Sequence, residues 1–396
     1  MISPAEASSA IRSHAPLLPA EKRSLESSIG GVLREAVHAT RDQPPFDRVT
    51  MDGVAFSFAA YAAGRRSFRI SGTQAAGAAP IALASSDACV EVMTGAMAPQ
   101  GCDCVIPIEK ISLSDGYAHL DAEVIASPGL NIHARGIDCQ AGRLLLQSGT
   151  RLGPAEAAVL ASTGIAEINV TREPRVVVIS TGDELVEPGR PIADWQIYRS
   201  NAYAVLAALK RRGFHHVRMD HLQDDLPTLR SRLRTHLDEN DVLILSGGVS
   251  MGRFDYVPQV LEELGVKRVF HKVAQRPGKP MWFGVGPEAK AVYALPGNPV
   301  STLICLARYV YLGLDTALGV SSAQTTGQAV MDEDFEVKPA LAFFLPVAMD
   351  GTARAQPRPT QGSGDFTSLL GTDGFVELPA GPALVSSDTR VPFYPW

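Results

Sequence analysis

From residue 174 to about residue 320 the chain alternates two hydrophobic patterns. Short apolar runs, typical of strands buried on both faces, are followed by longer segments in which apolar residues recur at helical spacing. Strands that alternate with helices predict an open, doubly wound, mostly parallel sheet, with ligands beyond the carboxyl ends of its strands. The predicted strands are Arg175–Ser180, His216–Leu222, Val242–Leu245, Val269–Val273 and Ala291–Leu295, and the predicted helices are Ala202–Arg212, Leu226–Leu237, Asp255–Leu264 and Val300–Leu312.

The rest of the chain divides into three further regions. Residues 3–40 are predicted to be helical, with Ser3 as N-cap and Pro4 at the first helical position, and Pro44-Pro45 ends this stretch. Short alternating strands follow from Val49 to about Asp121, for example Phe68–Ser71, Ala88–Met93 and Cys104–Pro107. We therefore expect an α/β multidomain fold with a helical and extended framework domain (1–40 and 135–171), an inserted β-rich domain (41–134), a doubly wound domain (172–324) and a C-terminal β domain (325–396).

Two glycine-containing turns each connect a predicted strand to a predicted helix. They are Ser246-Gly247-Gly248-Val249-Ser250 and Pro296-Gly297-Asn298-Pro299. At such a turn, free backbone N–H groups and the positive end of the helix dipole point the same way, which favours an anionic ligand. Each turn alone is equally compatible with a tight connection that binds nothing. The repetition of the geometry favours a phosphorylated or oxyanionic ligand.

Between the two turns lies a loop with two cations, Arg276-Pro277-Gly278-Lys279-Pro280. Proline fixes φ and glycine permits a sharp reversal, so the loop can aim its side chains in advance. Lysine suits an oxyanion as a point charge, and arginine can bind one through two hydrogen bonds. Loop cations are usually only solvated, but the rigidity of this loop favours a function.

Carboxylates recur at turns of the chain. Asp224 and Asp255 could each simply cap a helix, whereas Glu184 follows a buried strand with no helix to cap at once. Oxygen ligands gathered near phosphate donors suit Mg²⁺. We therefore expect a magnesium site that involves Glu184, Asp224 and Asp255, with Asp225 as an alternative to Asp224. The histidines lack the spacing of a zinc hydrolase.

The composition limits partners and compartment. With 36 Lys and Arg against 42 Asp and Glu, the net charge is −6, which argues against a nucleic-acid partner. The five cysteines contain no CxxC pair, so neither a disulfide framework nor a thiolate zinc site is supported. No apolar run reaches the roughly 18 residues of a membrane span, and Met1–Ser28 lacks the order of a signal peptide. The protein is expected in the cytoplasm, away from membranes.

The order of these motifs resembles the MoeA family, the molybdopterin molybdenumtransferases of molybdenum-cofactor biosynthesis, which is related to the E domain of gephyrin. The motifs span nearly the whole chain, in family order. They are Pro44-Pro-Phe-Asp47, Met51-Asp-Gly-Val-Ala55, Met93-Thr-Gly-Ala96 with Pro99 and Asp103, Gly136-Ile-Asp138, Ser180-Thr-Gly-Asp-Glu-Leu185, Ser200-Asn201, Asp224-Asp225, Ser246-Gly-Gly-Val-Ser-Met-Gly252, Asp255-Tyr256, Arg276-Pro-Gly-Lys-Pro280, Leu295-Pro-Gly-Asn-Pro-Val-Ser301 and Gln361-Gly-Ser363.

The resemblance implies a fold, a reaction and a set of residues. The doubly wound domain would be of the molybdopterin-binding, MogA-like kind. In a homodimer of four-domain subunits, residues of the inserted domain would face the doubly wound domain of the other subunit. Adenylylated molybdopterin and molybdate would give molybdenum cofactor and AMP with a divalent cation, Mg²⁺. The residues carried over are Asp52, Thr94, Asp138, Glu184, Asp224, Asp255, Arg276, Lys279 and Ser363. Partners would include the adenylyltransferase that precedes this step and the molybdenum enzyme that receives the product.

The chain departs from the family pattern at two places. Val49-Thr50 stands where Ser-Ala is common, and His133 stands where arginine is often found. Three other functions remain open on the residues. They are a molybdopterin adenylyltransferase or a nucleotide-hydrolysing CinA-like protein, a non-catalytic molybdopterin-binding scaffold, and a sulfate or tungstate carrier. The inserted-domain motifs argue against the first, and the absence of a fusion partner or long linker argues against the second.

Overall fold

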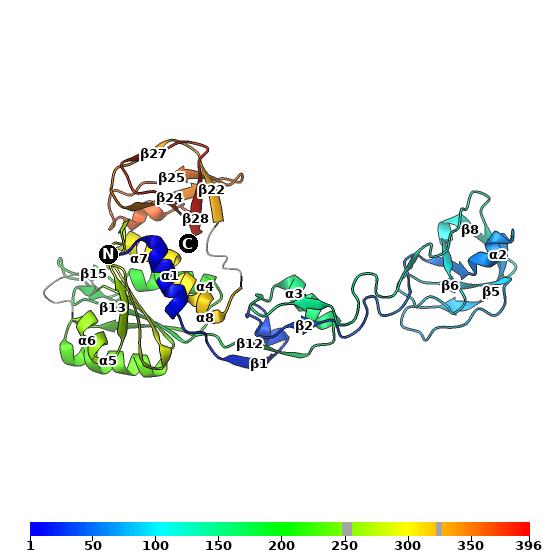
Figure 1. Cartoon of the computed structure of the whole chain (residues 1–396), viewed down its shortest axis with the longest axis horizontal. Coiled ribbons are helices and arrows are strands. Elements are labelled where there is room, and N and C mark those ends of the chain that lie inside the picture. The colour runs from blue at the N-terminus through cyan, green and yellow to red at the C-terminus, as the bar shows by residue number, and fades with distance from the viewer. Residues whose placement is uncertain (248–255, 322–326) are drawn as a thin grey trace. The chain divides into compact units, whose positions relative to one another are not determined.

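The computed structural model describes residues 1–247, 256–321 and 327–396. They form two compact units (Figure 1). Unit 1 comprises Met1–Glu35, Ser148–Ala157 and Glu167–Trp396, and unit 2 comprises Ala36–Gln147 and Ala158–Ala166. Across the described ranges, no helix combines the length and the apolar character needed to cross a membrane. The division into four domains stays a prediction.

Unit 1 contains the doubly wound sheet. Its six strands lie in the order β16-β13-β17-β21-β20-β18. The first four are parallel to one another, whereas β20, near one edge, runs antiparallel to both of its neighbours, β21 and β18. The prediction of an α/β fold with a mostly parallel sheet is therefore confirmed. The strands are β13 (Val176–Thr181), β16 (Val217–Leu222), β17 (Val242–Ser246), β18 (Lys267–His271), β20 (Trp282–Val285) and β21 (Ala291–Leu295), and a short pair, β14 (Leu185–Val186) and β15 (Ile197–Tyr198), lies outside this sheet.

Two details at the antiparallel edge differ from the prediction. The strand predicted at Val269–Val273 begins and ends two residues earlier, and β20 was not predicted. The Val273 N–H donates to the carbonyl oxygen of Lys279 at 2.9 Å, so Val273 closes the cationic loop instead of extending the strand. The chain then returns directly from that loop into β20.

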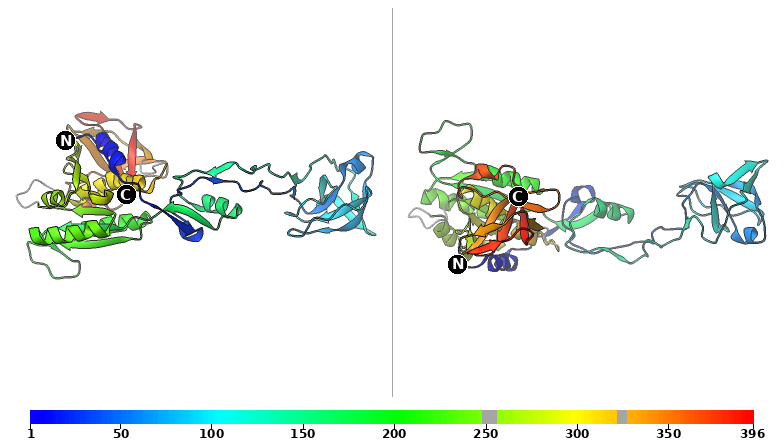
Figure 2. Two further views of the ribbon diagram at one scale, coloured as in Figure 1. Left: turned by 60° about the horizontal axis from the view of Figure 1, so that its bottom comes forward. Right: turned by 90° about the horizontal axis from the view of Figure 1, so that it is seen from above.

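Helices cover both faces of the sheet. Val176, Val178 and Ile244 point to one layer, and Val177 and Ile179 point to the other. The first layer holds α1, α4, α7 and α8, and the second holds α5 and α6. Figure 1 labels α1, in blue, beside the yellow helix α8, which it contacts, and Figure 2 shows the same ribbon from two further sides. The helices are α1 (Pro4–His14), α4 (Asn201–Arg211), α5 (Leu226–Glu239), α6 (Val257–Glu263), α7 (Pro299–Cys305) and α8 (Tyr311–Leu318), with a π-helical segment at Leu306–Val310 and a 3-10 turn at Pro287–Ala289.

The prediction of helix over residues 3–40 is wrong beyond its first part. α1 forms as predicted, with a capping box between Ser3 and Glu6. The next residues form strand β1 (Ala20–Ser24), which pairs antiparallel with β12 (Glu167–Thr171), and a 3-10 turn at Glu26–Ser28. The Glu-Lys-Arg run of β1 has good helix propensity, but its pairing with a distant strand overrides that local preference.

The C-terminal part of unit 1 is a small β domain, as predicted. Its strands β24, β25, β22, β28 and β26 pair in that order, and β26 also pairs with β24, which closes the ring. Strand β19 (Gln275–Arg276) from the cationic loop joins this sheet beside β24. The strands are β22 (Gly327–Met331), β24 (Ala342–Met349), β25 (Arg354–Pro357), β26 (Gly374–Leu378) and β28 (Arg390–Pro395), with a separate pair β23 (Phe335–Val337) and β27 (Ala383–Val385) and a 3-10 turn at Phe366–Leu369.

Unit 2 contains a six-stranded sheet in the order β7-β4-β6-β5-β9-β8. The predicted strands at Phe68–Ser71, Ala88–Met93 and Cys104–Pro107 are confirmed as parts of β5, β6 and β7. Phe56 and Phe68 stack in its core with ring centroids 4.4 Å apart. The elements are β2 (Val37–His38), β3 (Arg48–Val49), β4 (Gly53–Phe56), α2 (Phe58–Ala62), β5 (Ser67–Gln74), β6 (Ala88–Val92), β7 (Cys104–Pro107), β8 (Ile111–Ser114), β9 (Tyr117–Leu120), β10 (Ile132–His133) and β11 (Leu144–Leu146), with a 3-10 turn at Ile108–Lys110; helix α3 (Pro154–Ser162) contains a unit boundary.

Candidate functional site

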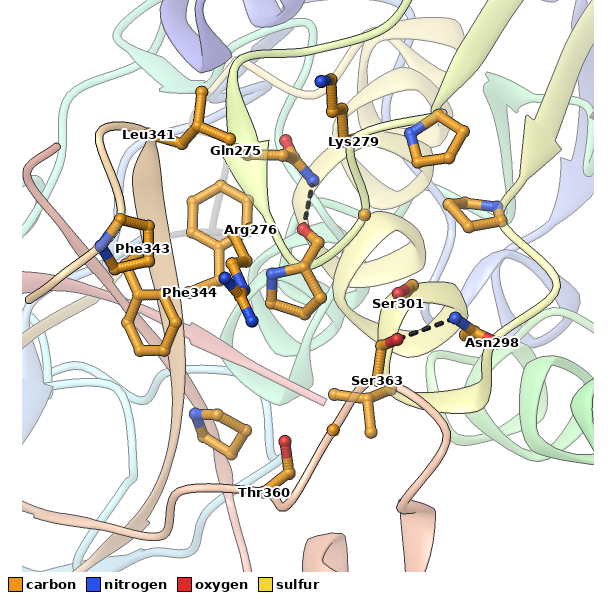
Figure 3. A pocket seen from close by; sticks show the side chains of 18 of the residues that line it. Gln275, Arg276, Lys279, Asn298, Ser301, Leu341, Phe343, Phe344, Thr360 and Ser363 are labelled. Carbon is orange, nitrogen blue, oxygen red and sulfur yellow. Dashed lines mark hydrogen bonds between the residues drawn. The ribbon is translucent and has the colours of Figure 1, made fainter. Parts of the chain in front are cut away.

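A cavity of about 940 Å³ opens at the carboxyl ends of the parallel strands in unit 1. One wall follows β13, β16, β17 and β21, and the opposite wall belongs to the C-terminal β domain (Figure 3). This is the place that the sheet topology predicts for a ligand. The predicted site residues that line it are Glu184, Asp224, Gly247, Arg276, Lys279, Pro296, Gly297, Asn298 and Ser363.

The cationic loop rests on a buried polar network. Gln275, which is fully buried, donates from Nε2 to the carbonyl oxygen of Pro277 at 3.1 Å and accepts a hydrogen bond from the Tyr309 hydroxyl. Gly278 has φ +91°, and a Cβ there would lie 2.6 Å from Gln275 Nε2 and 2.7 Å from Cys305 Sγ. Glycine is therefore required at this position both for its backbone conformation and for space.

The two cations of the loop are exposed, and their side chains have no ion pair with any described residue. They do not point the same way. In Figure 3, Arg276 lies beside Phe343 and Phe344, whereas Lys279 lies on the other side of the loop. A single anion held by both side chains therefore stays a prediction.

The two glycine turns are held together by a residue outside the predicted set. Asn201 donates from Nδ2 to Ser246 Oγ at 2.9 Å and to the carbonyl oxygen of Gly297 at 2.7 Å. Gly247 has φ +96°, and a Cβ there would lie 2.8 Å from the Thr181 carbonyl oxygen. Ser246 is buried behind the turn, and the predicted residues Gly248 and Ser250 lie outside the described residues.

The second turn is closed by the C-terminal β domain. Ser363 accepts a hydrogen bond from Asn298 Nδ2 on its hydroxyl at 2.7 Å, and its carbonyl oxygen accepts one from the Val300 N–H at 3.0 Å. Pro299, at the start of α7, has no N–H. The expectation that the first amides of this helix are free for an anion is therefore wrong, because one is absent and the next is bonded. Ser363 itself lines the cavity, and its role in binding a ligand stays a prediction.

The predicted carboxylates are only partly brought together. Glu184 and Asp224 line the cavity, and Asp255 lies outside the described residues. Asp225 instead caps α5 by accepting from the Thr228 N–H at 2.9 Å, and hydrogen bonds from Thr228 lower the pKa of this carboxyl. Of the neighbouring pair, Asp224 is thus the one at the cavity. Among residues 1–247, 256–321 and 327–396, no three His, Cys, Asp or Glu side chains form a metal-ligand cluster.

Two contacts tie the chain after β13 to the chain after β16. His221 Nε2 lies 2.9 Å from the carbonyl oxygen of Gly182, to which it can only donate, and the Asp183 carboxylate accepts from the Asp224 N–H at 3.2 Å. The turn that carries Glu184 and the turn that carries Asp224 are therefore held as one structure. The predictions from the sequence did not include His221.

Three predicted residues belong to unit 2. Thr94 donates to Asp52 Oδ1 from its N–H at 2.6 Å and from its hydroxyl at 2.7 Å. These bonds, the backbone one first, lower the pKa of Asp52, which is therefore ionised at neutral pH. Asp138 Oδ1 lies 2.9 Å from His133 Nε2. The histidine that replaces the family's arginine thus contacts a predicted site residue.

Family models match three successive parts of the chain. Residues 2–164 match the MoeA N-terminal region (domains I and II), residues 177–314 a probable molybdopterin-binding domain, and residues 328–396 the MoeA C-terminal region (domain IV). The molybdopterin molybdenumtransferase of Synechocystis sp. is 41% identical over 401 residues, which cover 100% of both chains. This chain belongs to the MoeA family.

Other MoeA proteins are similar over most of their length. The molybdopterin molybdenumtransferase of Bacillus subtilis is 30% identical over 368 residues, which cover 90% of this chain and 85% of that one. The crystal structure of a molybdopterin biosynthesis MoeA protein from Pyrococcus horikoshii matches with a TM-score of 0.82 and 32% identity, and covers 100% of this chain and 99% of that chain. The resemblance that the sequence motifs indicate is confirmed.

In this member of the MoeA family, sequence reasoning missed the residues that support the site. Asn201 belongs to the Ser200-Asn201 motif, which predicts no role for it, and Gln275 and Tyr309 carry no signal in the sequence beyond their place in a strand and a helix. A polar residue directly before the Arg-Pro-Gly-Lys loop, in an apolar context, was the available sign for Gln275. A buried polar side chain needs a partner, which here holds the loop.

Proposed function

We propose that this chain is a molybdopterin molybdenumtransferase, which transfers molybdenum from molybdate to adenylylated molybdopterin and releases AMP. One observation carries the proposal: a single cavity holds two cations, Arg276 and Lys279, and two carboxylates, Glu184 and Asp224. This combination suits a substrate that joins an oxyanion to a phosphoanhydride. Relatives at 41% and 30% identity carry this enzyme name.

The residues of the cavity would contribute in two ways, by supplying charge and by positioning the substrates. Lys279 offers a compact positive charge for molybdate, and the Ser363 hydroxyl and the turn at Gly297 give further polar contacts. Glu184 and Asp224 would hold Mg²⁺, which takes one or two carboxylates and fills its other positions with phosphate oxygens and water. When bound, the ion neutralises charge on the anhydride. Molybdenum joins the dithiolene as the anhydride is cleaved, so positioning and neutralisation supply most of the catalysis.

The proposal is tested by measuring AMP released from adenylylated molybdopterin with and without molybdate. A molybdenumtransferase releases AMP in proportion to the molybdate supplied. An adenylyltransferase would instead form adenylylated pterin from ATP and molybdopterin, a scaffold would bind the pterin without turnover, and an oxyanion carrier would bind molybdate without consuming the pterin. Molybdate-independent release, or none, would contradict the proposal.

We further propose that the active form is a homodimer. Met51 and Met93, which precede Asp52 and Thr94 in the sequence, are 41% and 42% exposed, and large apolar side chains exposed at such positions suit a surface that a partner covers. A second copy, presenting its doubly wound domain, is the proposed cover. Mixing inactive Asp52→Ala with inactive Glu184→Ala subunits should then restore part of the activity, because one hybrid site is intact. Mixtures that exchange subunits but stay inactive would exclude this arrangement.

The proposed compartment is the cytoplasm. All five cysteines are free, as expected of a protein in a reducing compartment. Burial raises the pKa of Cys89 and of Cys102 to about 12 and that of Cys104 to about 11, so these thiols stay protonated. Cell fractionation followed by detection of the chain tests the placement, and recovery with the membrane or secreted fraction would contradict it.

A further inference from the structure

The cavity has a second wall whose chemistry the proposed reaction centre does not use. It comes from the C-terminal β domain and presents aromatic and apolar side chains to the cavity, among them Phe335 and Phe343. The two rings stack with centroids 5.9 Å apart and planes at 17°. Both are only partly buried, so each packs on the domain core and still borders the cavity. Exposed aromatic surface inside a polar cavity indicates a ligand part that is flat and uncharged.

A cation lies beside this aromatic wall. Arg276 pairs with Phe343 in the parallel register of β19 and β24, so both side chains leave the same side of the sheet. Figure 3 shows the Arg276 guanidinium beside Phe343, with Lys279 on the other side of the loop. Among the described residues, the Arg276 side chain has no ion-pair partner. A guanidinium stacks on aromatic rings and also binds phosphate through two hydrogen bonds.

We propose that Phe335, Phe343 and Arg276 form a stacking subsite for a fused nitrogen heterocycle that is linked to phosphate. This inference rests on the proposed function and deepens it, since adenylylated molybdopterin carries two such rings, a purine and a pterin. The aromatic faces hold the ring, and Arg276 contacts either the ring face or the adjoining phosphate. Lys279 and the carboxylates then act on the rest of the molecule at the opposite wall.

Stacking of a base on an aromatic side chain changes affinity by roughly ten- to one-hundred-fold. The test uses the full chain and three probes, AMP, ribose 5-phosphate and 6-hydroxymethylpterin, with dissociation constants from calorimetry. Phe343→Leu should weaken binding of AMP or of the pterin by at least about ten-fold and leave ribose 5-phosphate unchanged. Phe343→Tyr, which keeps the ring, should restore the affinity. Phe393→Leu is the matched control, because Phe393 is also a partly buried aromatic on the same domain core but does not line the cavity.

The probe that loses affinity identifies which ring the subsite holds. Loss for AMP alone assigns the purine, and loss for the pterin alone assigns the pterin. The proposal is overturned if Phe343→Leu and Phe335→Leu, with wild-type melting curves, bind every probe as the wild type does, or if neither ring probe binds the wild type. Failure of the proposed function looks different: the ring probes bind and depend on Phe343, yet wild-type protein releases no AMP in response to molybdate.

Discussion

Replacing Gly278 by alanine tests directly whether the buried network positions the cationic loop. The new Cβ would lie 2.6 Å from Gln275 Nε2 and 2.7 Å from Cys305 Sγ, distances at which something must move. Neither of these two side chains can move without a substantial energetic cost. Gln275 and Cys305 are both fully buried, and the Tyr309 hydroxyl holds Gln275 from the other side.

The cost has two parts that can be separated. A left-handed backbone at an alanine costs about 1–2 kcal/mol, and overpacking in a filled core costs about 1–3 kcal/mol more. We expect the exposed part of the loop to move, since its displacement disturbs less packing than a shift of the core. A displacement of about 1 Å at a charge-positioning loop lowers kcat/KM by on the order of 100-fold.

The assay pairs melting curves with molybdate-dependent AMP release. Gly213→Ala is the matched control: Gly213 has φ +85°, close to that of Gly278, but a Cβ there meets nothing within 4 Å. The control should be destabilised only by the cost of the left-handed backbone and should keep its activity. Gly278→Ala/Cys305→Ala should regain some activity, because one of the two overlaps is removed. If Gly278→Ala melts like Gly213→Ala and keeps wild-type AMP release, the network does not position the loop.

Three further substitutions test other parts of the site and fold. Lys279→Met should lower AMP release at limiting molybdate by about 100-fold without changing the melting curve, and unchanged release would exclude its role. Mg²⁺ and adenylylated pterin together should raise the melting temperature by more than the sum of their separate shifts. Glu184→Gln should remove this excess, whereas the control Glu123→Gln, at an exposed position, should keep it. Additive shifts in the wild type would mean that the metal and the pterin bind at separate sites. Burial alone would raise the pKa of Asp241. Hydrogen bonds from Arg172, two of them at 2.9 Å, and from Arg175 outweigh the effect of burial and hold this pKa well below 3.8. Because the pKa of Asp241 is lower in the folded protein, its ionised carboxylate stabilises the fold above about pH 4, and this contribution is lost as the pH falls. Asp241→Asn should therefore lower the free energy of unfolding by about 2 kcal/mol at pH 7 and by progressively less under acid conditions. A loss of stability that does not depend on pH would contradict this.

The central strands could be predicted because their environment leaves a local signal. Val176–Thr181, Val242–Ser246 and Ala291–Leu295 are buried on both faces, so each is a continuous apolar run in the sequence. Ala20–Ser24 left the opposite signal. Its burial alternates between exposed and intermediate, its residues favour helix, and the pairing with Glu167–Thr171 that makes it a strand is invisible locally.

The sequence could predict the site residues that lie in an unusual motif, but not the residues that hold those site residues in place through hydrogen bonds. Arg276 and Lys279 stood out because two prolines and a glycine frame them. Asn201 and Gln275 act through hydrogen bonds to residues distant in the sequence or to backbone atoms, so no local pattern marks them. The bond from the Val300 N–H to Ser363 depends on how the C-terminal β domain packs, which decides whether a helix amide is free.

The central claim is that one cavity couples molybdenum insertion to cleavage of the adenylyl anhydride. The most direct measurement is a single turnover in which AMP and pterin-bound molybdenum are counted in the same sample. The account predicts one molybdenum bound for each AMP released, at equal rates, and loss of both in Lys279→Met. Release of AMP without molybdenum bound to the pterin, or molybdenum bound while the adenylyl group stays intact, would contradict it.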